Sequence, residues 1–481
     1  MAKNQLTPKT VDMSKWYTQV IYQSCLADYA PVKGCMVIRP NGYEIWENIH
    51  DALDPLLKNL GIRNAYFPIF IPLSLLNKEA KHIEGFSPEL AIVTHGGGEE
   101  LKEKLAIRPT SETVMYTMYS KWVHSYRDLP LLLNQWNNVV RWEKRTYFFL
   151  RTTEFLWQEA HTAHATHEEA WQMVLDGLSA YKNMVENYLA IPVISGKKSA
   201  HETFAGATLT TTIEALMPDG KALQAGTSHD LGQNFSQKTA FDIAFQDQKG
   251  NTAYAWQTSF GLSTRIIGAL IMTHGDDDGL VLPPRIAPIQ VAILPAQESE
   301  VVTHVCEKLA EDLKKSGIRI AYLSDLTHSL GWRLNEAEIQ GTPLTVVIGE
   351  RELAAKKLTA KIRHNRTEET VNIENADRTI QRILETIQED MYKKALKNMK
   401  ELTTEVQTFE EFEQVMKSKR GFIKAFWCEQ ESCETAIKRE TKATTRCLPF
   451  INERGAVSEE KGVCIKCGKE CTHRWLFAQA Y

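Results

Sequence analysis

The sequence has no long apolar run, no repeat of fixed period and no low-complexity tract. Its most apolar stretch, AYFPIFIPLSLL at 65–76, is short and contains two prolines, so it predicts a buried strand rather than a membrane span. The first residues, 1–16, lack the apolar core of a signal peptide. A strong excess of positive charge is also missing, because the formal net charge is −4, and contact with nucleic acid therefore needs local basic patches. We expect a cytoplasmic protein without a membrane partner.

Cysteine is sparse over most of the chain and dense at its end. Thiols of a cytosolic protein stay reduced, so such clustering favours a metal site over disulfides. The pairs Cys428/Cys433 and Cys464/Cys467 have the spacing of a four-thiolate structural Zn²⁺ site. Cys471 could replace one ligand, and reduced cysteines without metal are the alternative. The remaining cysteines are scattered or unassigned: Cys25, Cys35, Cys306 and Cys447.

The length of the sequence, and the change in its pattern of strand-like and helical segments, predict three domains. Residues 1–284 read as one large α+β unit, and the proline-rich stretch DGLVLPPRIAP at 278–288 reads as a linker after it. Strand-like and helical runs then alternate, which predicts an α/β domain with a mainly parallel sheet and a trailing helix at 285–395. Within it, KKLTAKIRHNR at 356–366 is basic enough to face an RNA backbone, although such a run is also typical of a solvated strand. Residues 396–481 form a small domain that carries the cysteine cluster.

The stretch VVRWEKRTYFFLRTTEFLWQEAH at 139–161 contains neither Gly nor Pro and predicts two antiparallel strands. Alternation along a strand puts Arg141 and Glu143 on one face of the first strand, with a loop at 144–149. The same face of the returning strand shows alternate residues. These are Arg151, Thr153, Phe155, Trp157, Glu159 and His161. Arginines bind phosphate or carboxylate, and aromatic rings stack on a purine, so the face suits a charged ligand with flat parts. The alternative is a solvated face with cross-strand salt bridges.

Three segments together resemble the signature motifs of class II aminoacyl-tRNA synthetases. Motif 2 is the stretch 139–161, with its Arg-x-Glu strand, loop and returning strand. Motif 1 is GYEIWENIHDALDPLLKNLGIRNAYFPIFIP at 42–72, and motif 3 is SFGLSTRIIGALI at 259–271. Further segments, IRPTSETVMY, AGTSHDLGQNF and GLVLPPRIAPIQV among them, are similar to prolyl-tRNA synthetases of the archaeal and eukaryotic type. With the cysteine-rich tail, the resemblance covers nearly the whole chain.

The resemblance implies both a fold and an activity. The fold is an α+β catalytic domain on an antiparallel sheet (the class II synthetase fold), then an α/β anticodon-binding domain and a small α/β zinc-binding domain. The activity is ATP-dependent attachment of proline to tRNA(Pro) through a prolyl-adenylate. Motif 1 implies a homodimer with contacts around Pro68. Only about 100 residues separate Glu159 from Gly261, so an editing insertion between motifs 2 and 3 is not expected.

The resemblance also implies roles for individual residues. Arg141 and Arg265 are the expected catalytic residues, and Mg²⁺ is expected with ATP near Gln224. The expected ATP-binding residues are Arg141, Glu143, Arg151, Thr152, Phe155, Gln224, Thr227, Ser263 and Arg265. The expected proline-binding residues are Thr110, Glu112, Arg141, Trp157, Glu159, His161, Phe204 and His229. The terminal Tyr481 is expected near the active site.

Three other functions compete with this interpretation. A threonyl- or histidyl-tRNA synthetase shares the class, but the threonyl type holds zinc in its amino-acid site, whereas the cysteines here lie near the C-terminus. A non-catalytic, RNA-binding paralogue would be expected to lose Arg141, Glu143 or Arg265, and all three are present. A zinc-dependent nucleic-acid-binding factor would be more basic and would leave the ATP motifs unexplained.

Overall fold

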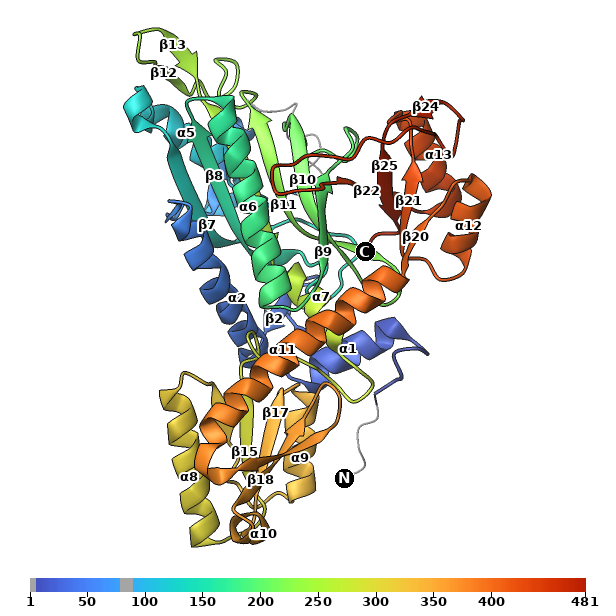
Figure 1. Cartoon of the computed structure of the whole chain (residues 1–481). Helices are drawn as coiled ribbons and strands as arrows, with labels where there is room; N and C mark the ends of the chain where they lie inside the picture. The colour runs from blue at the N-terminus through green and yellow to red at the C-terminus, as the bar shows by residue number, and fades with distance from the viewer. Residues whose placement is uncertain (1–5, 78–89) are drawn as a thin grey trace.

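The computed structural model of the 481-residue chain describes residues 6–77 and 90–481. Positions 1–5, part of the stretch compared with a signal peptide, lie outside the described residues. Figure 1 shows a large body built on a long sheet, an α/β body at its lower end and a C-terminal body beside it. The long helix α11 (Ala376–Glu401) runs between the two smaller bodies. No helix among the described residues is long and apolar enough to cross a membrane.

The large body is organised by an antiparallel sheet, as the resemblance predicts. Its strands follow the order β9-β10-β11-β14-β8-β7-β3, and only the short edge strand β3 pairs in parallel. Their bounds are β3 Arg63–Asn64, β7 Leu131–Val140, β8 Glu154–His164, β9 Val193–Lys197, β10 Leu209–Leu216, β11 Ala222–Gly232 and β14 Trp256–Ser263.

Helices with one apolar face cover this sheet. Helix α6 (His167–Asn187) begins where the Thr166 side chain accepts a hydrogen bond from the Glu169 N–H, and it packs on β11 and β14. Helix α2 (Pro40–Asn59) begins at a proline, which suits a first helical position, and its apolar residues Ile45, Ile49, Leu53 and Leu57 are buried. Helices α1 (Met13–Gln23) and α7 (Arg265–His274) share this core with them.

The prediction of a single buried strand at 65–76 is wrong. The structure has a three-residue strand β4 (Phe70–Pro72), followed at once by helix α3 (Leu73–Asn77). Pro68 and Pro72 carry no backbone N–H, so they cannot continue a ladder of strand hydrogen bonds. Strand β4 pairs with β6 (Glu99–Ile107), which pairs with β5 (Ile92–Gly96). Other elements of this body are β1 Ala27–Tyr29, β2 Met36–Ile38, α5 Glu112–Trp122, a 3-10 turn Tyr126–Asp128, β12 Ala244–Gln246 and β13 Thr252–Tyr254.

The motif 2 hairpin has a longer connection than the alternation predicts. Strand β7 ends at Val140 and β8 begins at Glu154, so Arg141, Glu143 and Arg151 lie in the connection rather than on strands. The Arg141 N–H still donates to the Thr153 carbonyl at 2.8 Å. Beyond that bond the chain folds inward, because residues 148–150 are apolar and buried in the main core.

The second body has the predicted α/β arrangement. Strands β16, β15 and β17 are parallel, and β18 and β19 extend the sheet in antiparallel fashion. Gly317 follows α8 with φ +76°, and a glycine in this left-handed conformation commonly ends a helix. The bounds are β15 Val291–Pro295, α8 Glu300–Lys315, β16 Ile320–Tyr322, α9 Leu330–Ile339, β17 Leu344–Ile348, α10 Glu350–Ala354, β18 Lys357–Ile362, β19 Glu368–Asn372 and a 3-10 turn Ile373–Asn375.

The predicted linker 278–288 is packed rather than loose. Leu280, Leu282 and Ile286 are buried, and the Leu280 N–H donates to the carbonyl of Ile339 in the second body at 3.1 Å. Asp276, just before it, receives two hydrogen bonds from the guanidinium of Arg363 at 2.6 and 2.7 Å. The two bodies are therefore held together by buried apolar contacts and by the ion pair between Asp276 and Arg363.

The C-terminal body extends the sheet of the large body. Strand β22 (Thr444–Pro449) pairs with β9 through Leu448 and Lys197, so one eleven-stranded sheet runs through both bodies. Helix α11 passes the predicted boundary at 395 and ends at Glu401. The other elements are β20 Thr403–Glu405, α12 Phe409–Lys417, β21 Phe422–Phe426, α13 Glu431–Thr441, β23 Gly462–Val463, β24 Glu470–Cys471 and β25 Arg474–Ala478.

Candidate active site

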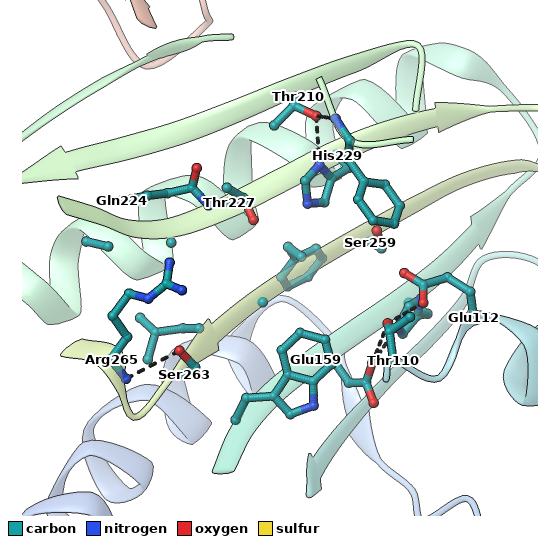
Figure 2. Close-up of a pocket in the computed structure, with 18 of the residues that line it drawn as sticks. Thr110, Glu112, Glu159, Thr210, Gln224, Thr227, His229, Ser259, Ser263 and Arg265 are labelled. Carbon is teal, nitrogen blue, oxygen red and sulfur yellow. Dashed lines mark hydrogen bonds and ion pairs between the residues drawn. The ribbon is translucent and has the colours of Figure 1, made fainter. Parts of the chain in front are cut away.

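A cavity of about 270 Å³ opens on the face of the antiparallel sheet (Figure 2). Its lining brings together most of the residues predicted from the sequence, which are far apart along the chain. These residues are Thr110, Glu112, Arg141, Phe155, Trp157, Glu159, His161, Phe204, Gln224, Thr227, His229, Ser263 and Arg265. Figure 2 shows Arg265 and Gln224 toward one end of the cavity and Glu112 and Thr110 toward the other.

Strand register explains why these side chains meet. Phe155, Trp157, Glu159 and His161 alternate along β8, so they point to one face, as predicted. Neighbouring strand β14 aligns Ser259 with His161, Gly261 with Glu159 and Ser263 with Trp157. On the next strand, β11, Thr227 lies opposite Gly261 and His229 opposite Ser259. The cavity floor is thus made by three adjacent antiparallel strands.

One end of the cavity is acidic. One side-chain oxygen each of Glu112 and Glu159 and one ring nitrogen of His161 lie within 4.8 Å of one another, and all three residues are buried. Burial alone raises the pKa of Glu159, but hydrogen bonding and charge from His161, with hydrogen bonds from Ser111 and Asn137, lower it to about 2. Burial lowers the pKa of His161, but the charges of Glu112 and Glu159 raise it above its usual value overall.

The Glu159 carboxylate is fixed by donors that the sequence analysis missed. The Ser111 N–H donates to it at 3.1 Å and the Ser111 hydroxyl donates as well, while Asn137 Nδ2 donates at 2.7 Å and Gln135 Nε2 at 3.3 Å. On the other side of His161, the Tyr116 hydroxyl lies 3.1 Å from Nδ1. A signal was present, because strand 131–140 has amides at 135 and 137, and Gln135 pairs directly with Glu159 on the neighbouring strand, so that their side chains share a face.

His229 and Phe204 make a neutral wall. The His229 ring lies 4.9 Å from the Phe204 ring, and its Nδ1 is 2.9 Å from the Thr210 hydroxyl. Burial, with smaller contributions from the charges of His161 and Lys198, lowers the pKa of His229 to about 3. His229 is therefore uncharged at neutral pH and acts as an aromatic surface.

The other end of the cavity is basic. The Arg141 guanidinium lies 5.5 Å from the Phe155 ring and 5.4 Å from the Trp157 ring, and Arg141 Nε donates to the Pro109 carbonyl at 3.1 Å. Arg265 Nε donates to the Leu150 carbonyl at 3.1 Å. The Arg265 side chain reaches solvent through the cavity but has a dense protein environment, and this burial, with the charges of Arg141 and Arg151, lowers its pKa to about 10. It remains charged at neutral pH, so Arg141 and Arg265 bring two cations to the same end of the cavity.

Three predicted ATP-binding residues do not line this cavity: Glu143, Arg151 and Thr152. Arg151 Nε lies 3.3 Å from Glu143 Oε1 in an ion pair, and Arg151 lines an adjoining cavity together with Gln224 and Arg265. Thr152 is buried, and its hydroxyl donates to the Glu154 carbonyl at 2.7 Å. The cavity instead includes Glu202, Thr210 and Ser259, which the sequence analysis did not select.

The four predicted zinc ligands meet in the C-terminal body. The Sγ atoms of Cys428, Cys433, Cys464 and Cys467 all lie within 4.8 Å of one another. The Sγ atoms of Cys428 and Cys467 are 3.7 Å apart, which fits a tetrahedral site with Zn–S bonds of about 2.3 Å. Cys471 is outside this group, and its Sγ donates to the Gly462 carbonyl at 3.7 Å. The donor set is therefore compatible with a structural zinc ion held by the first four cysteines.

Comparison with protein families divides the chain in the same order as the structure. Residues 93–274 match the family "tRNA synthetase class II core domain (G, H, P, S and T)", and residues 290–383 match "Anticodon binding domain". Residues 409–481 match "Prolyl-tRNA synthetase, C-terminal". These matches confirm the predicted fold class.

Comparison with whole proteins extends the match to the full chain. A proline--tRNA ligase of Chlorobium chlorochromatii is 51% identical over 99% of this chain and 100% of its own length. A "Proline--tRNA ligase 2" of Clostridioides difficile is 48% identical over 100% of both chains. The crystal structure of a prolyl-tRNA synthetase from Cryptosporidium parvum, complexed with halofuginone and AMPPNP, superposes with a TM-score of 0.94 at 41% identity, and the match covers 99% of each chain. The chain therefore belongs to the prolyl-tRNA synthetase family of class II aminoacyl-tRNA synthetases.

Proposed function

We propose that this protein is a proline--tRNA ligase that activates proline with ATP and transfers it to tRNA(Pro). The observation that carries the proposal is a single cavity with buried carboxylates at one end and the guanidiniums of Arg141 and Arg265 at the other. An amino acid has a cationic and an anionic end, and ATP adds a polyanion, so such a cavity matches both reactants. The related Cryptosporidium structure holds AMPPNP, which supports a nucleotide on this fold.

The acidic end is the proposed proline pocket. If His161 is protonated, it balances Glu159, and Glu112 is left with a negative charge that the secondary ammonium of proline would neutralise. Thr110, whose hydroxyl donates to Glu112, would accept from the same ammonium. The pyrrolidine ring would lie against the aromatic residues of the cavity. These are Trp157, His161, Phe204 and His229.

The basic end is the proposed nucleotide pocket. Arg141 would contact both the proline carboxylate and the α-phosphate, because a planar guanidinium can donate to two anions at once. Phe155 would stack on adenine, and Glu143 would accept from its exocyclic amine. Arg265, at the start of α7, would hold the far phosphates, where the helix dipole also favours an anion. The remaining proposed ATP contacts are Arg151, Thr152, Gln224, Thr227 and Ser263, with Mg²⁺ on the phosphates near Gln224.

The chemistry then needs mainly positioning and charge neutralisation. In the first step, a proline carboxylate oxygen attacks the α-phosphorus, and pyrophosphate leaves with the electron pair of the broken P–O bond. Arg141 and Arg265 stabilise the charge that develops on the phosphate oxygens. In the second step, a hydroxyl oxygen at the tRNA 3′ end attacks the prolyl carbonyl carbon and loses its proton, and AMP leaves with the electron pair of the broken bond between that carbon and the phosphate oxygen.

The other parts of the chain have proposed roles that agree with this reaction. We place the domains at 1–284, 285–395 and 396–481, with the second binding the anticodon arm of tRNA(Pro) through its basic strand β18. A structural zinc on the four cysteines would need reduced thiols, as the cytoplasm provides. We also propose that the protein forms a homodimer through motif 1. We further propose that it belongs to the archaeal and eukaryotic type, which the eukaryotic structural relative supports, although the sequence relatives described above are bacterial.

Editing in cis is not part of the proposed function. Residues 160–260, all of them described, form α6, strands of the central sheet and the small hairpin β12–β13, with no further domain between motifs 2 and 3. A proline pocket alone discriminates against smaller substrates by only about 1–3 kcal/mol per methylene. Purified protein should therefore mischarge tRNA(Pro) with alanine detectably, and rapid deacylation of alanyl-tRNA by this chain alone would contradict the proposal.

The test of the proposed function is amino-acid-dependent exchange of labelled pyrophosphate into ATP, measured with each of the twenty amino acids. Exchange with proline, followed by aminoacylation of tRNA(Pro), is the expected result. Exchange with threonine or histidine but not with proline would replace the assignment, and no exchange with any amino acid would favour a non-catalytic role.

A further inference from the structure

A second cavity, of about 380 Å³, adjoins the active-site cavity and shares Gln224 and Arg265 with it. We call it the arginine cavity, after the four guanidinium groups in its lining: Arg145, Arg151, Arg265 and Arg446. Its walls come from the β7–β8 connection, the start of β11, strand β22 and the C-terminal residues. No Asp or Glu side chain occurs among the described lining residues. Cations therefore outnumber anions around this space.

Arg446 reaches the cavity from the C-terminal body and is held rigidly. Its Nε and Nη2 donate to Glu214 Oε2 at 3.0 and 2.7 Å, and its Nη1 donates to the Thr444 hydroxyl at 3.2 Å. Lys198 Nζ donates to the other oxygen of Glu214 at 2.9 Å. All three charged side chains are nearly sealed from solvent, with exposures of 7% for Arg446, 2% for Lys198 and 0% for Glu214. The single carboxylate of Glu214 thus pairs with two cations, and a net positive charge remains beside the cavity.

This surplus charge acts on the active site. Burial is the main cause of the low pKa of Arg265, and Arg141, Arg151 and Arg446 each lower it further by repulsion. Cations gathered in a partly desolvated space are costly unless an anion joins them. A guanidinium also has more N–H groups than the bonds from Arg446 to Glu214 and Thr444 use, so Arg446 can still donate to a ligand.

The far wall of the cavity is anchored to the catalytic sheet. The Tyr481 N–H donates to the Ala222 carbonyl at 3.1 Å, and its hydroxyl donates to Asp219 Oδ2 at 2.7 Å. The Lys221 ammonium lies 4.5 Å from the Tyr481 ring centroid. Tyr481 is therefore held against the start of strand β11, at the edge of the arginine cavity.

We infer that the arginine cavity receives the pyrophosphate that leaves ATP, and that Arg446 brings the C-terminal body into the nucleotide site. The inference rests on the proposed function, since it needs ATP in the adjoining cavity. When the proline oxygen bonds to the α-phosphorus, the β-phosphate oxygen takes the electron pair of the broken bond, and the pyrophosphate gains negative charge. Arg265 lies in both cavities, so it stays in contact with this product as it moves from one to the other. Arg145 and Arg446 then provide the charge at the far end.

The test compares variants of the arginine cavity with a matched control. Arg145→Gln and Arg446→Met remove one guanidinium each, Arg446→Lys keeps the charge without the fork, and Arg439→Gln removes an exposed arginine of α13 outside the cavity. The readouts are the KM for pyrophosphate in proline-dependent exchange, and calorimetric binding of inorganic pyrophosphate alone. Loss of one hydrogen bond to a charged group predicts a rise of about 10-fold or more in the KM for pyrophosphate in the first two variants. The KM for proline and the Arg439→Gln variant should stay within about 2-fold of wild type.

Two outcomes decide the inference. If Arg145→Gln and a folded Arg446→Met both keep the wild-type KM and affinity for pyrophosphate, the inference is wrong. If Arg446→Met fails to fold because it leaves Glu214 and Lys198 unbalanced, Arg446→Lys takes its place and must weaken pyrophosphate binding. Failure of the proposed function looks different, because the wild type would then show no proline-dependent exchange. In that case calorimetry with pyrophosphate alone, on wild type and Arg145→Gln, still tests the cavity.

Discussion

Replacing Glu112 with Gln tests the charge balance of the proline pocket. Glu112 is buried, accepts a hydrogen bond from Thr110 and lies in one cluster with Glu159 and His161. Glu159 is already paired with His161, at 3.2 Å between Oε2 and Nε2. Glu112 is therefore the carboxylate that remains to neutralise the ammonium of proline.

The structure sets the expected size of the effect. A Gln side chain keeps the shape of Glu112 but carries no charge, so a cationic ligand would enter a pocket without a counter-ion. A hydrogen bond to a charged group contributes about 1.5–3 kcal/mol. At about 1.4 kcal/mol per factor of ten, the KM for proline should rise by roughly 10- to 100-fold. The KM for ATP should change little, because Glu112 lies at the end of the cavity away from Arg265 (Figure 2).

The assay is pyrophosphate exchange at varied proline and at saturating ATP, for wild type, Glu112→Gln and Glu202→Gln. Glu202 lines the same cavity but lies outside the Glu112, Glu159 and His161 cluster, so its variant controls for the loss of any negative charge there. We expect the control to stay within about 3-fold of wild type. A wild-type KM for proline in Glu112→Gln, or an equal rise in both variants, would refute the reasoning.

Three further predictions concern Arg265, the zinc expected on the four cysteines, and the contact of Asp276 with Arg363. Arg265→Lys keeps a charge but loses the planar fork, so kcat/KM for ATP should fall by roughly 30- to 100-fold in exchange assays, while the KM for proline stays near wild type. Elemental analysis should find about one zinc per chain, and Cys433→Ser should lose it together with the thermal stability of the C-terminal body. Burial alone raises the pKa of Asp276, but hydrogen bonds and charge from Arg363, with Arg366, lower it to about 2. Its stabilising contribution is therefore complete above about pH 4 and is lost as the pH falls toward 2, so Asp276→Asn should reduce the pH dependence of unfolding in that window.

The strand alternation of β8 was sufficient to predict one wall of the active site. Phe155, Trp157, Glu159 and His161 have a period of two, and a strand must place them on one face. The position of Arg141 was less predictable. It was expected on a strand, but the buried residues 148–150 draw the connection inward and end the pairing earlier.

Contacts between distant segments could not be predicted from the sequence. Arg446 and Glu214 are 232 residues apart, and nothing in either local sequence indicates that β22 continues the catalytic sheet beside β9. The amides at 135 and 137 gave a weak signal, because polar residues on a buried strand need partners, but the partner Glu159 becomes evident only with the strand register. Local patterns therefore predict elements and faces, whereas charge networks depend on the tertiary fold.

The central claim is that Arg141 meets proline and the α-phosphate together while Arg265 holds the far phosphates. A crystal structure of this protein with proline and a non-hydrolysable ATP analogue would test it most directly. The account predicts both ligands in the one cavity, with Arg141 nitrogens within about 3.2 Å of a proline carboxylate oxygen and an α-phosphate oxygen. Ligands bound in separate cavities, or an Arg141 guanidinium that touches neither of them, would contradict it.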